Sequence, residues 1–153
     1  MNVVEATAGD APRMSEILTD ILLSWNSQRP RSAQHVLEHY IDHPDGIRCS
    51  VARDQTGTII GFQSLKVASA NNPFDLPIGW GIIGTYVTSA TGRHGVGRAL
   101  FLSSLDAARA AGLKQIDATI GADNRAALAY YEAMGFETYR TLPGAVGKRR
   151  IVN

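Results

Sequence analysis

A glycine-rich turn constrains this chain more than any other part of its sequence. An apolar run, residues 82–87, is typical of a strand, and an amphipathic run, residues 96–111, is typical of a helix. A turn between a strand and a helix start gathers several backbone N–H groups in one patch, where the helix dipole adds positive charge. The sequence therefore predicts a phosphate or diphosphate site made by Gly92, Arg93, His94, Gly95, Val96, Gly97 and Arg98.

The remaining patterns predict the fold around this turn. Helical spacing indicates two helices before residue 44, and Asp54 to Gly57 is typical of a hairpin turn between two strands. A strand, helix and strand across residues 82–120 imply a parallel crossover, whereas the hairpin implies antiparallel pairing. We therefore expect an α/β protein with a mixed sheet, helices on both faces, the order βααβββαβαββ and one domain, residues 1–153.

Composition excludes several classes of protein. The chain has 15 basic and 14 acidic residues, and this balance argues against a general nucleic-acid surface. No apolar run reaches the length of a membrane span, and no secretory signal is apparent, so no membrane association is expected. The only cysteine, Cys49, lies on an alternating strand pattern that predicts a buried thiol. Because it has no partner for a disulfide, a cytoplasmic location is expected.

Three kinds of glycine loop could carry the phosphate. A nucleotide loop of the G-x-x-x-x-G-K-[S/T] type requires a lysine, but Arg98 and Ala99 follow Gly97. A dinucleotide fingerprint requires a third glycine where this chain has Leu100. The third option is an acyl-coenzyme A site.

A second motif supports this third option. The chain resembles the GCN5-related N-acetyltransferase (GNAT) family in its turn, Gly-Arg-His-Gly-Val-Gly from residue 92. It also resembles the family in the run from Asn124 to Tyr131-Glu-Ala-Met-Gly-Phe136, which comes about 30 residues later. The residues 120–124 and 144–148 are similar to the branch that includes phosphinothricin and L-amino-acid N-acetyltransferases.

The resemblance implies the GNAT acyl-coenzyme A N-acyltransferase fold and transfer of acetyl from acetyl-coenzyme A to an amine, with no metal. It implies that two strands part, and that the pantetheine arm lies between them. Tyr131 would donate a proton to the departing thiolate, and the Val87 N–H would stabilise the oxyanion. The cofactor would contact the seven turn residues together with Thr85, Tyr86, Val87, Thr88, Asn124, Tyr130 and Tyr131.

The chain departs from the family pattern at two places. Gly92 replaces the usual Arg or Gln, and the strand before the turn lacks the glutamate that serves many relatives as general base. A water held by Thr85 or by the backbone, or an amine that arrives already neutral, would remove the need for that glutamate. Other candidate bases are Glu38, His39, His43 and Asp75.

The acceptor is expected to be a small-molecule amine, an amino acid or an analogue. Residues 25–31 and 68–79 would form its pocket, where Arg29 and Arg31 are candidates to pair with a carboxylate. The second segment contains no arginine, which argues against phosphinothricin itself. Two alternatives stay open, namely a non-catalytic acyl-coenzyme A sensor and a protein N-terminal acetyltransferase. The resemblance also implies a homodimer.

Overall fold

The computed structural model describes residues 1–89 and 95–153. The helices and strands follow the order that the sequence predicts, with two additions, a 3-10 turn before the first helix and a π-helical turn after the second. The helical elements are η1 (Ala8–Asp10), α1 (Ala11–Ser24), α2 (Ala33–Val36), η2 (Leu37–Ile41), α3 (Val96–Ala110) and α4 (Arg125–Ala133). The strands are β1 (Asn2–Glu5), β2 (Gly46–Arg53), β3 (Ile59–Val67), β4 (Gly81–Val87), β5 (Gln115–Gly121), β6 (Glu137–Leu142) and β7 (Ala145–Ile151).

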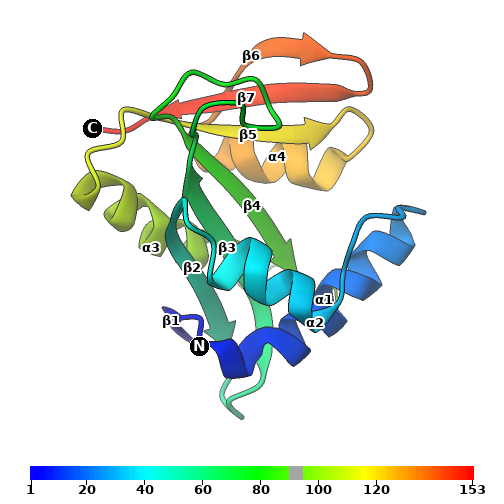
Figure 1. Cartoon of the computed structure of the whole chain (residues 1–153). Coiled ribbons are helices and arrows are strands. Elements are labelled where there is room, and N and C mark those ends of the chain that lie inside the picture. Colours follow the sequence, from blue (N-terminus) through cyan, green and yellow to red (C-terminus); the bar gives the residue numbers. More distant parts are fainter. Residues whose placement is uncertain (90–94) are drawn as a thin grey trace.

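The strands form one mixed sheet with the order β1-β2-β3-β4-β5-β7-β6 (Figure 1). Among the strands of the described residues, only β4 and β5 pair in parallel, because α3 connects them as a crossover, and the other neighbours pair antiparallel. Phe62 and Tyr86 pack with α1 and α2, whereas Leu65 and Ile83 pack with α3 on the opposite face. The prediction of a mixed sheet with helices on both faces is confirmed.

The parallel pair β4–β5 is short. Only Gly81 with Ile116 and Ile82 with Asp117 are in register, after which the two strands diverge (Figure 1). By contrast, β3 and β4 stay paired from Lys66 with Ile82 to Gly61 with Val87. The sheet is therefore continuous at the start of β4 and parted at its end, as the resemblance implied.

Local signals in the sequence explain where most elements begin and end. Ser32 caps α2 by accepting the His35 N–H, and Gly57 makes the predicted hairpin turn with a φ of 85°. The apolar pattern extends back to Ile78 and predicts a strand that starts there, but this start is wrong, because Gly79 has a φ of 94° and β4 begins only at Gly81. Cys49 is buried as predicted, and burial raises the pKa of its thiol to about 12.

None of the helices in the described part of the chain combines the length and the apolar character needed to cross a bilayer.

Candidate active site

The end of β4 presents backbone groups to the gap between the parted strands. The Thr88 N–H is donated to Ile60 O on β3 at 3.0 Å. Because pairing directions alternate along a strand, Tyr86 and Gly84 also direct their N–H groups to β3, and Val87 and Thr85 direct theirs away from it. The Val87 N–H is therefore directed to the gap, where it can bond to the pantetheine arm. The Thr88 N–H is already used in a hydrogen bond to β3.

The α3 N-terminus stands at the far end of the predicted turn. Gly95 caps the helix with a φ of 78°, a left-handed conformation that favours glycine. Gly95 O accepts the first bond of the helix, from the Ala99 N–H, so the N–H groups of Val96, Gly97 and Arg98 precede that bond. These are the donors that a diphosphate requires. Gly92, Arg93 and His94 lie outside the described residues.

The structure shows why position 97 requires a glycine, which the sequence did not indicate. A Cβ at Gly97 would lie 2.6 Å from Tyr130 Cε1. The Tyr130 hydroxyl also donates to Gly97 O at 2.7 Å, so this tyrosine fastens α4 to the first turn of α3. The Tyr130 ring therefore occupies the space that the missing side chain of Gly97 leaves.

A chain of polar side chains leads from β3 to Tyr131. The buried Gln63 donates from Nε2 to Thr85 Oγ1 at 2.9 Å and to Tyr130 Oη at 3.0 Å. Thr85 Oγ1 lies 2.8 Å from Tyr131 Oη. Burial raises the pKa of Tyr131 far above its usual value, and the pKa of Tyr130 to about 12. Both hydroxyls therefore stay protonated at neutral pH and can donate.

Gln63 is a site residue that the sequence analysis missed. Its Oε1 is buried and has no hydrogen-bond partner among the described residues, an arrangement that is costly unless a ligand or a water supplies a donor. The signal was available, because Gln63 and Ser64 interrupt the apolar stretch of residues 59–65, and Gln63 carries the larger polar group.

Two further predicted contacts lie on α4 and α3. Asn124 caps α4 by accepting the Ala127 N–H at 3.2 Å, which commits its Oδ1 and leaves its NH₂ group for a bond to the pantetheine arm. Arg98 is exposed and lines a hollow between α3, the end of α4 and Arg150 on β7.

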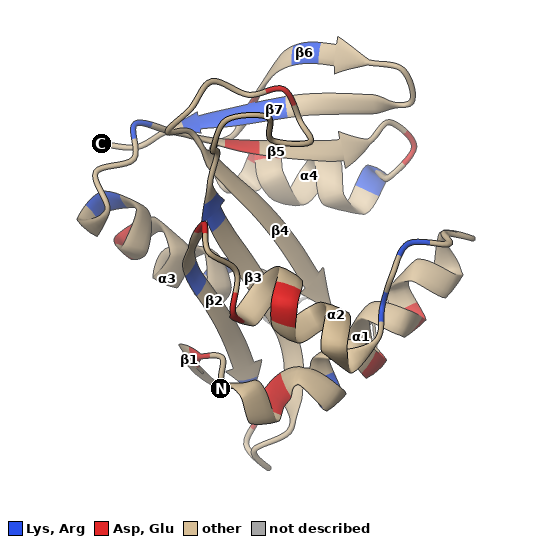
Figure 2. Ribbon diagram, viewed as in Figure 1, with Lys and Arg blue, Asp and Glu red and all other residues tan. Residues whose placement is uncertain are grey.

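The opposite face of the sheet carries the candidate acceptor side. Arg29 Nη2 donates to Tyr86 Oη at 3.2 Å, and Tyr40 Oη donates to the same oxygen at 3.3 Å. Figure 2 shows the basic segment that contains Arg29 between α1 and α2. Arg31 is used differently, since it donates to Ser27 O and Arg29 O of its own loop. The structure thus separates two arginines that the sequence could not distinguish.

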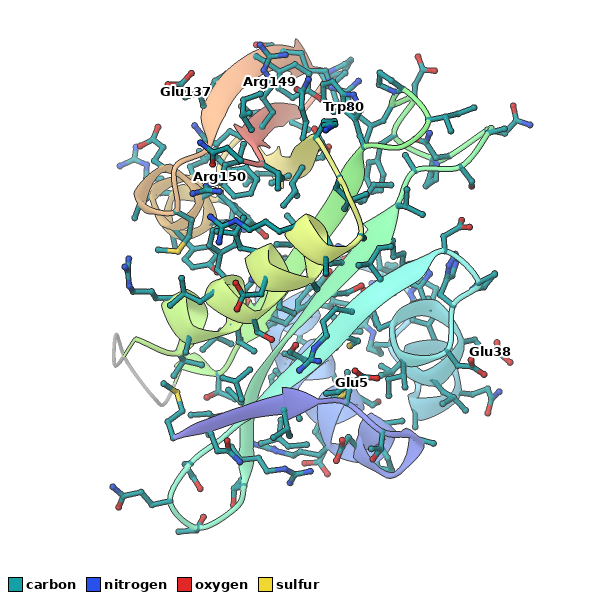
Figure 3. The ribbon with its side chains drawn as sticks, turned by 90° about the vertical axis from the view of Figure 1, so that its left-hand side faces the viewer. Glu5, Glu38, Trp80, Glu137, Arg149 and Arg150 are labelled. Carbon is teal, nitrogen blue, oxygen red and sulfur yellow. The ribbon has the colours of Figure 1, made fainter. Side chains whose placement is uncertain are left out.

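The other predicted wall, residues 68–79, is held against the C-terminal hairpin. Arg140 on β6 donates to Phe74 O at 2.8 Å, and the Trp80 ring lies 5.6 Å from the ring of Tyr139. The guanidinium of Arg149 covers the same tyrosine at 5.4 Å, and Figure 3 shows Trp80 and Arg149 at one end of the sheet.

The structure shows the surroundings of each residue that was considered as a general base. Burial and the nearby Lys66 lower the pKa of His39 to about 4, which makes it a weak base. His43 Nδ1 already accepts the Asp45 N–H, and Glu38 accepts from Gln34 on an exposed surface. Asp75 is exposed in its loop.

A buried carboxylate that the sequence analysis missed lies where the strands part. Asp117 is fully buried, accepts hydrogen bonds from Tyr139 at 2.6 Å and from Thr119 at 2.8 Å, and belongs to the last β4–β5 pair. Burial raises the pKa of this carboxyl. Its signal was the alternation of Asp117 with the apolar residues Ile116 and Ala118.

A parted mixed sheet beside a glycine-capped helix and a buried tyrosine hydroxyl defines an acyltransferase-type fold. The model of the acetyltransferase (GNAT) family matches residues 13–136, and the chain therefore belongs to this family. A curated relative, the mycothiol acetyltransferase of Saccharomonospora viridis, is 37% identical over 93 residues, which are 60% of this chain. The match covers only 30% of that relative's length.

Solved structures share the whole fold. A phosphinothricin acetyltransferase from Sinorhizobium meliloti, in complex with acetyl-coenzyme A, superposes with a TM-score of 0.82 at 20% identity, covering 99% of this chain and 88% of that one. A ribosomal-protein-alanine N-acetyltransferase from Brucella melitensis superposes with a TM-score of 0.77 at 20% identity, covering 99% of both chains. At these identities the structures support the fold, and they do not select an acceptor.

Proposed function

We propose that the protein is an acetyl-coenzyme A-dependent N-acetyltransferase whose acceptor is the amine of a small molecule, an amino acid or an analogue. The observation that carries the proposal is the gap between β4 and β5. Backbone groups of Val87 face it from one side, and the Tyr131 hydroxyl is bonded to Thr85 beside it. Family membership and a neighbour solved with acetyl-coenzyme A support the same ligand.

The residues of the gap fit such a ligand. An extended arm with amide groups can add to an exposed strand edge, as a peptide does, and β4 offers this edge after Ile82. The backbone N–H groups at the start of α3 suit a diphosphate. The unpaired Gln63 Oε1 could accept a hydrogen bond from an N–H or O–H group of the ligand. When bound, acetyl-coenzyme A supplies an activated acetyl group as a thioester.

Two groups of the protein, the Val87 N–H and the Tyr131 hydroxyl, would then stabilise the developing charge and supply a proton. The Val87 N–H, which points away from β3, would stabilise the negative charge that develops on the carbonyl oxygen of a thioester bound in the gap. As the amine nitrogen forms its bond to the acetyl carbon, the carbon–sulfur bond breaks, and Tyr131 donates its proton to the sulfur. The nitrogen loses one proton to water, and Tyr131 regains one, so the transfer is neutral overall.

A transfer assay tests this proposal directly. The protein is incubated with acetyl-coenzyme A and a panel of amines that includes the amino acids, and acetylated products are identified by mass spectrometry while thiol release is followed. We expect stoichiometric product and thiol with at least one small amine. Thiol release without any acetylated acceptor would contradict the proposal.

Two alternatives give different results in the same experiment. A sensor of acyl-coenzyme A is favoured by the absence of a carboxylate on β4, and it would bind the cofactor in calorimetry without transferring the acetyl group. A protein N-terminal acetyltransferase would modify peptides that begin with a suitable residue and leave the small amines unmodified.

A further inference from the structure

We propose that Arg29, Tyr40 and Tyr86 form a subsite for a carboxylate of the acceptor, next to the amine that reacts. This inference rests on the proposed function and narrows its substrate class to amines that carry a carboxylate close to the nitrogen.

The first argument is the count of donors and acceptors. Tyr86 Oη accepts one hydrogen bond from Arg29 and one from Tyr40, which uses both of its lone pairs. Its own proton has no acceptor among the described residues, and the remaining N–H groups of Arg29 face no carboxylate within salt-bridge distance there. Tyr40 Oη can still accept, but the Arg29 guanidinium carries more N–H donors than the two tyrosine oxygens can use, and a charged donor set of this kind suits a carboxylate.

The second argument is position. A Cβ at Gly84 would lie 3.7 Å from the Tyr86 hydroxyl, so this ring folds back over β4 itself. Tyr86 also immediately precedes Val87, whose N–H faces the gap. A carboxylate held by the Tyr86 hydroxyl therefore lies on the sheet face beside the parted strands, and the short spacer of an amino acid keeps its amine near the same place.

The third argument is charge. Lys66 on β3 lies 5.5 Å from the centre of the Tyr40 ring, and burial lowers the pKa of its ammonium to about 8. Asp45, which accepts from Ser69, acts on Lys66 from beyond salt-bridge distance, and neither Lys66 nor Arg29 has a carboxylate within salt-bridge distance among the described residues. Two cations without a close carboxylate partner, Arg29 and Lys66, therefore lie near Tyr40, and they would attract an anionic acceptor.

Matched acceptors test the subsite. Steady-state kinetics compare L-amino acids with their carboxamides and with the amines that lack the carboxyl group, for the wild type, Arg29→Gln, Tyr86→Phe and the surface control Arg109→Gln. We expect Arg29→Gln to lower kcat/KM for the amino acids by about 10- to 100-fold, the effect of losing a charge-assisted hydrogen bond. The carboxamides should change by less than about 3-fold on the same scale. Arg109→Gln should behave like the wild type.

A binding measurement keeps the test independent of turnover. Calorimetry in the presence of coenzyme A compares N-acetyl amino acids with their carboxamides, for the wild type and Arg29→Gln. Tighter binding of the carboxylates, lost in Arg29→Gln, supports the subsite. Equal binding or equal turnover of acids and carboxamides, or an Arg29→Gln variant that retains the preference, overturns it. Absence of any acetylated amine counts against the proposed function instead, and the binding data still decide the subsite.

Discussion

At the scale of single residues, the Tyr131 hydroxyl forms a hydrogen bond with Thr85 Oγ1 at 2.8 Å. Because burial keeps this phenol protonated, it serves as a donor rather than as a base. The substitution Tyr131→Phe removes the hydroxyl that would donate the proton and changes the side-chain volume very little. We expect kcat to fall about 10-fold or more, in the range for a general acid, while the dissociation constant for acetyl-coenzyme A stays similar. Single-turnover kinetics and calorimetry measure the two quantities.

A second tyrosine-to-phenylalanine variant controls for the loss of a hydrogen-bonded hydroxyl. Tyr139→Phe removes a hydroxyl of the same kind, bonded to Asp117 at 2.6 Å and outside the proposed proton path. Its turnover should stay within about 3-fold of the wild type. If Tyr131→Phe turns over as fast as this control, Tyr131 has no part in proton transfer.

The sequence allowed some of these residues to be predicted, because motifs report what a position needs. Tyr131 and Asn124 were predicted in this way, and the structure places Tyr131 on α4 and Asn124 at its N-cap. Gln63 and Asp117 were missed because each owes its significance to neighbours from other strands, to Thr85 for the first and to Tyr139 for the second. Such partners become visible only once the register of the sheet is known.

At the scale of elements, α2, η2 and the turn that follows them carry three neighbouring histidines, His35, His39 and His43. The rings of His35 and His39 stack at 4.8 Å, and His43 meets His39 edge-on at 6.0 Å. Burial is the largest cause that lowers the pKa of His39 to about 4, followed by Lys66 on β3, the two other histidines and Arg29. Each of these neighbours disfavours a charge on His39.

This arrangement predicts a pH dependence of stability. Between about pH 6.5 and 4 the unfolded chain binds a proton at His39 that the native protein does not, so the free energy of unfolding falls as the pH falls. Because the ring is partly exposed, we expect His39→Gln to remove only about 1 kcal/mol of this loss. Urea denaturation at several pH values measures it, and an NMR titration of His39 with a midpoint near 6.5 would refute the premise.

The boundaries of elements were predictable where a local signal exists. The Ser32 cap and the hairpin at Gly57 follow from residue type alone. The π-helical turn at Leu37–Ile41 had no such signal, because its geometry depends on how Tyr40 packs against Phe62 and Tyr86. Elements that tertiary packing shapes are beyond a reading of local patterns.

At the scale of the whole molecule, the strand order follows from the sequence only in part. The hairpins and the crossover could be predicted, but the insertion of β7 between β5 and β6 requires a long-range pairing that no local pattern specifies. The parting of β4 from β5 was expected from the family resemblance alone. Beside the parted strands, α3 and α4 meet at Gly97 and Tyr130, on the face where Gln63, Thr85 and Tyr131 form their polar chain.

The parted sheet makes a prediction for hydrogen exchange. In the protein without ligand, the amides of Thr85 and Val87 should exchange faster than those of Gly84 and Tyr86, because only the latter pair face β3. Acetyl-coenzyme A should slow Thr85 and Val87, whereas β6 and β7, which pair with each other along their length, should not respond. ATP, which carries phosphates but no pantetheine arm, should protect the start of α3 and leave Thr85 and Val87 unchanged. Equal protection of these two amides by both ligands would mean that the arm does not pair with β4, and the edge of the parted strand would then need another occupant.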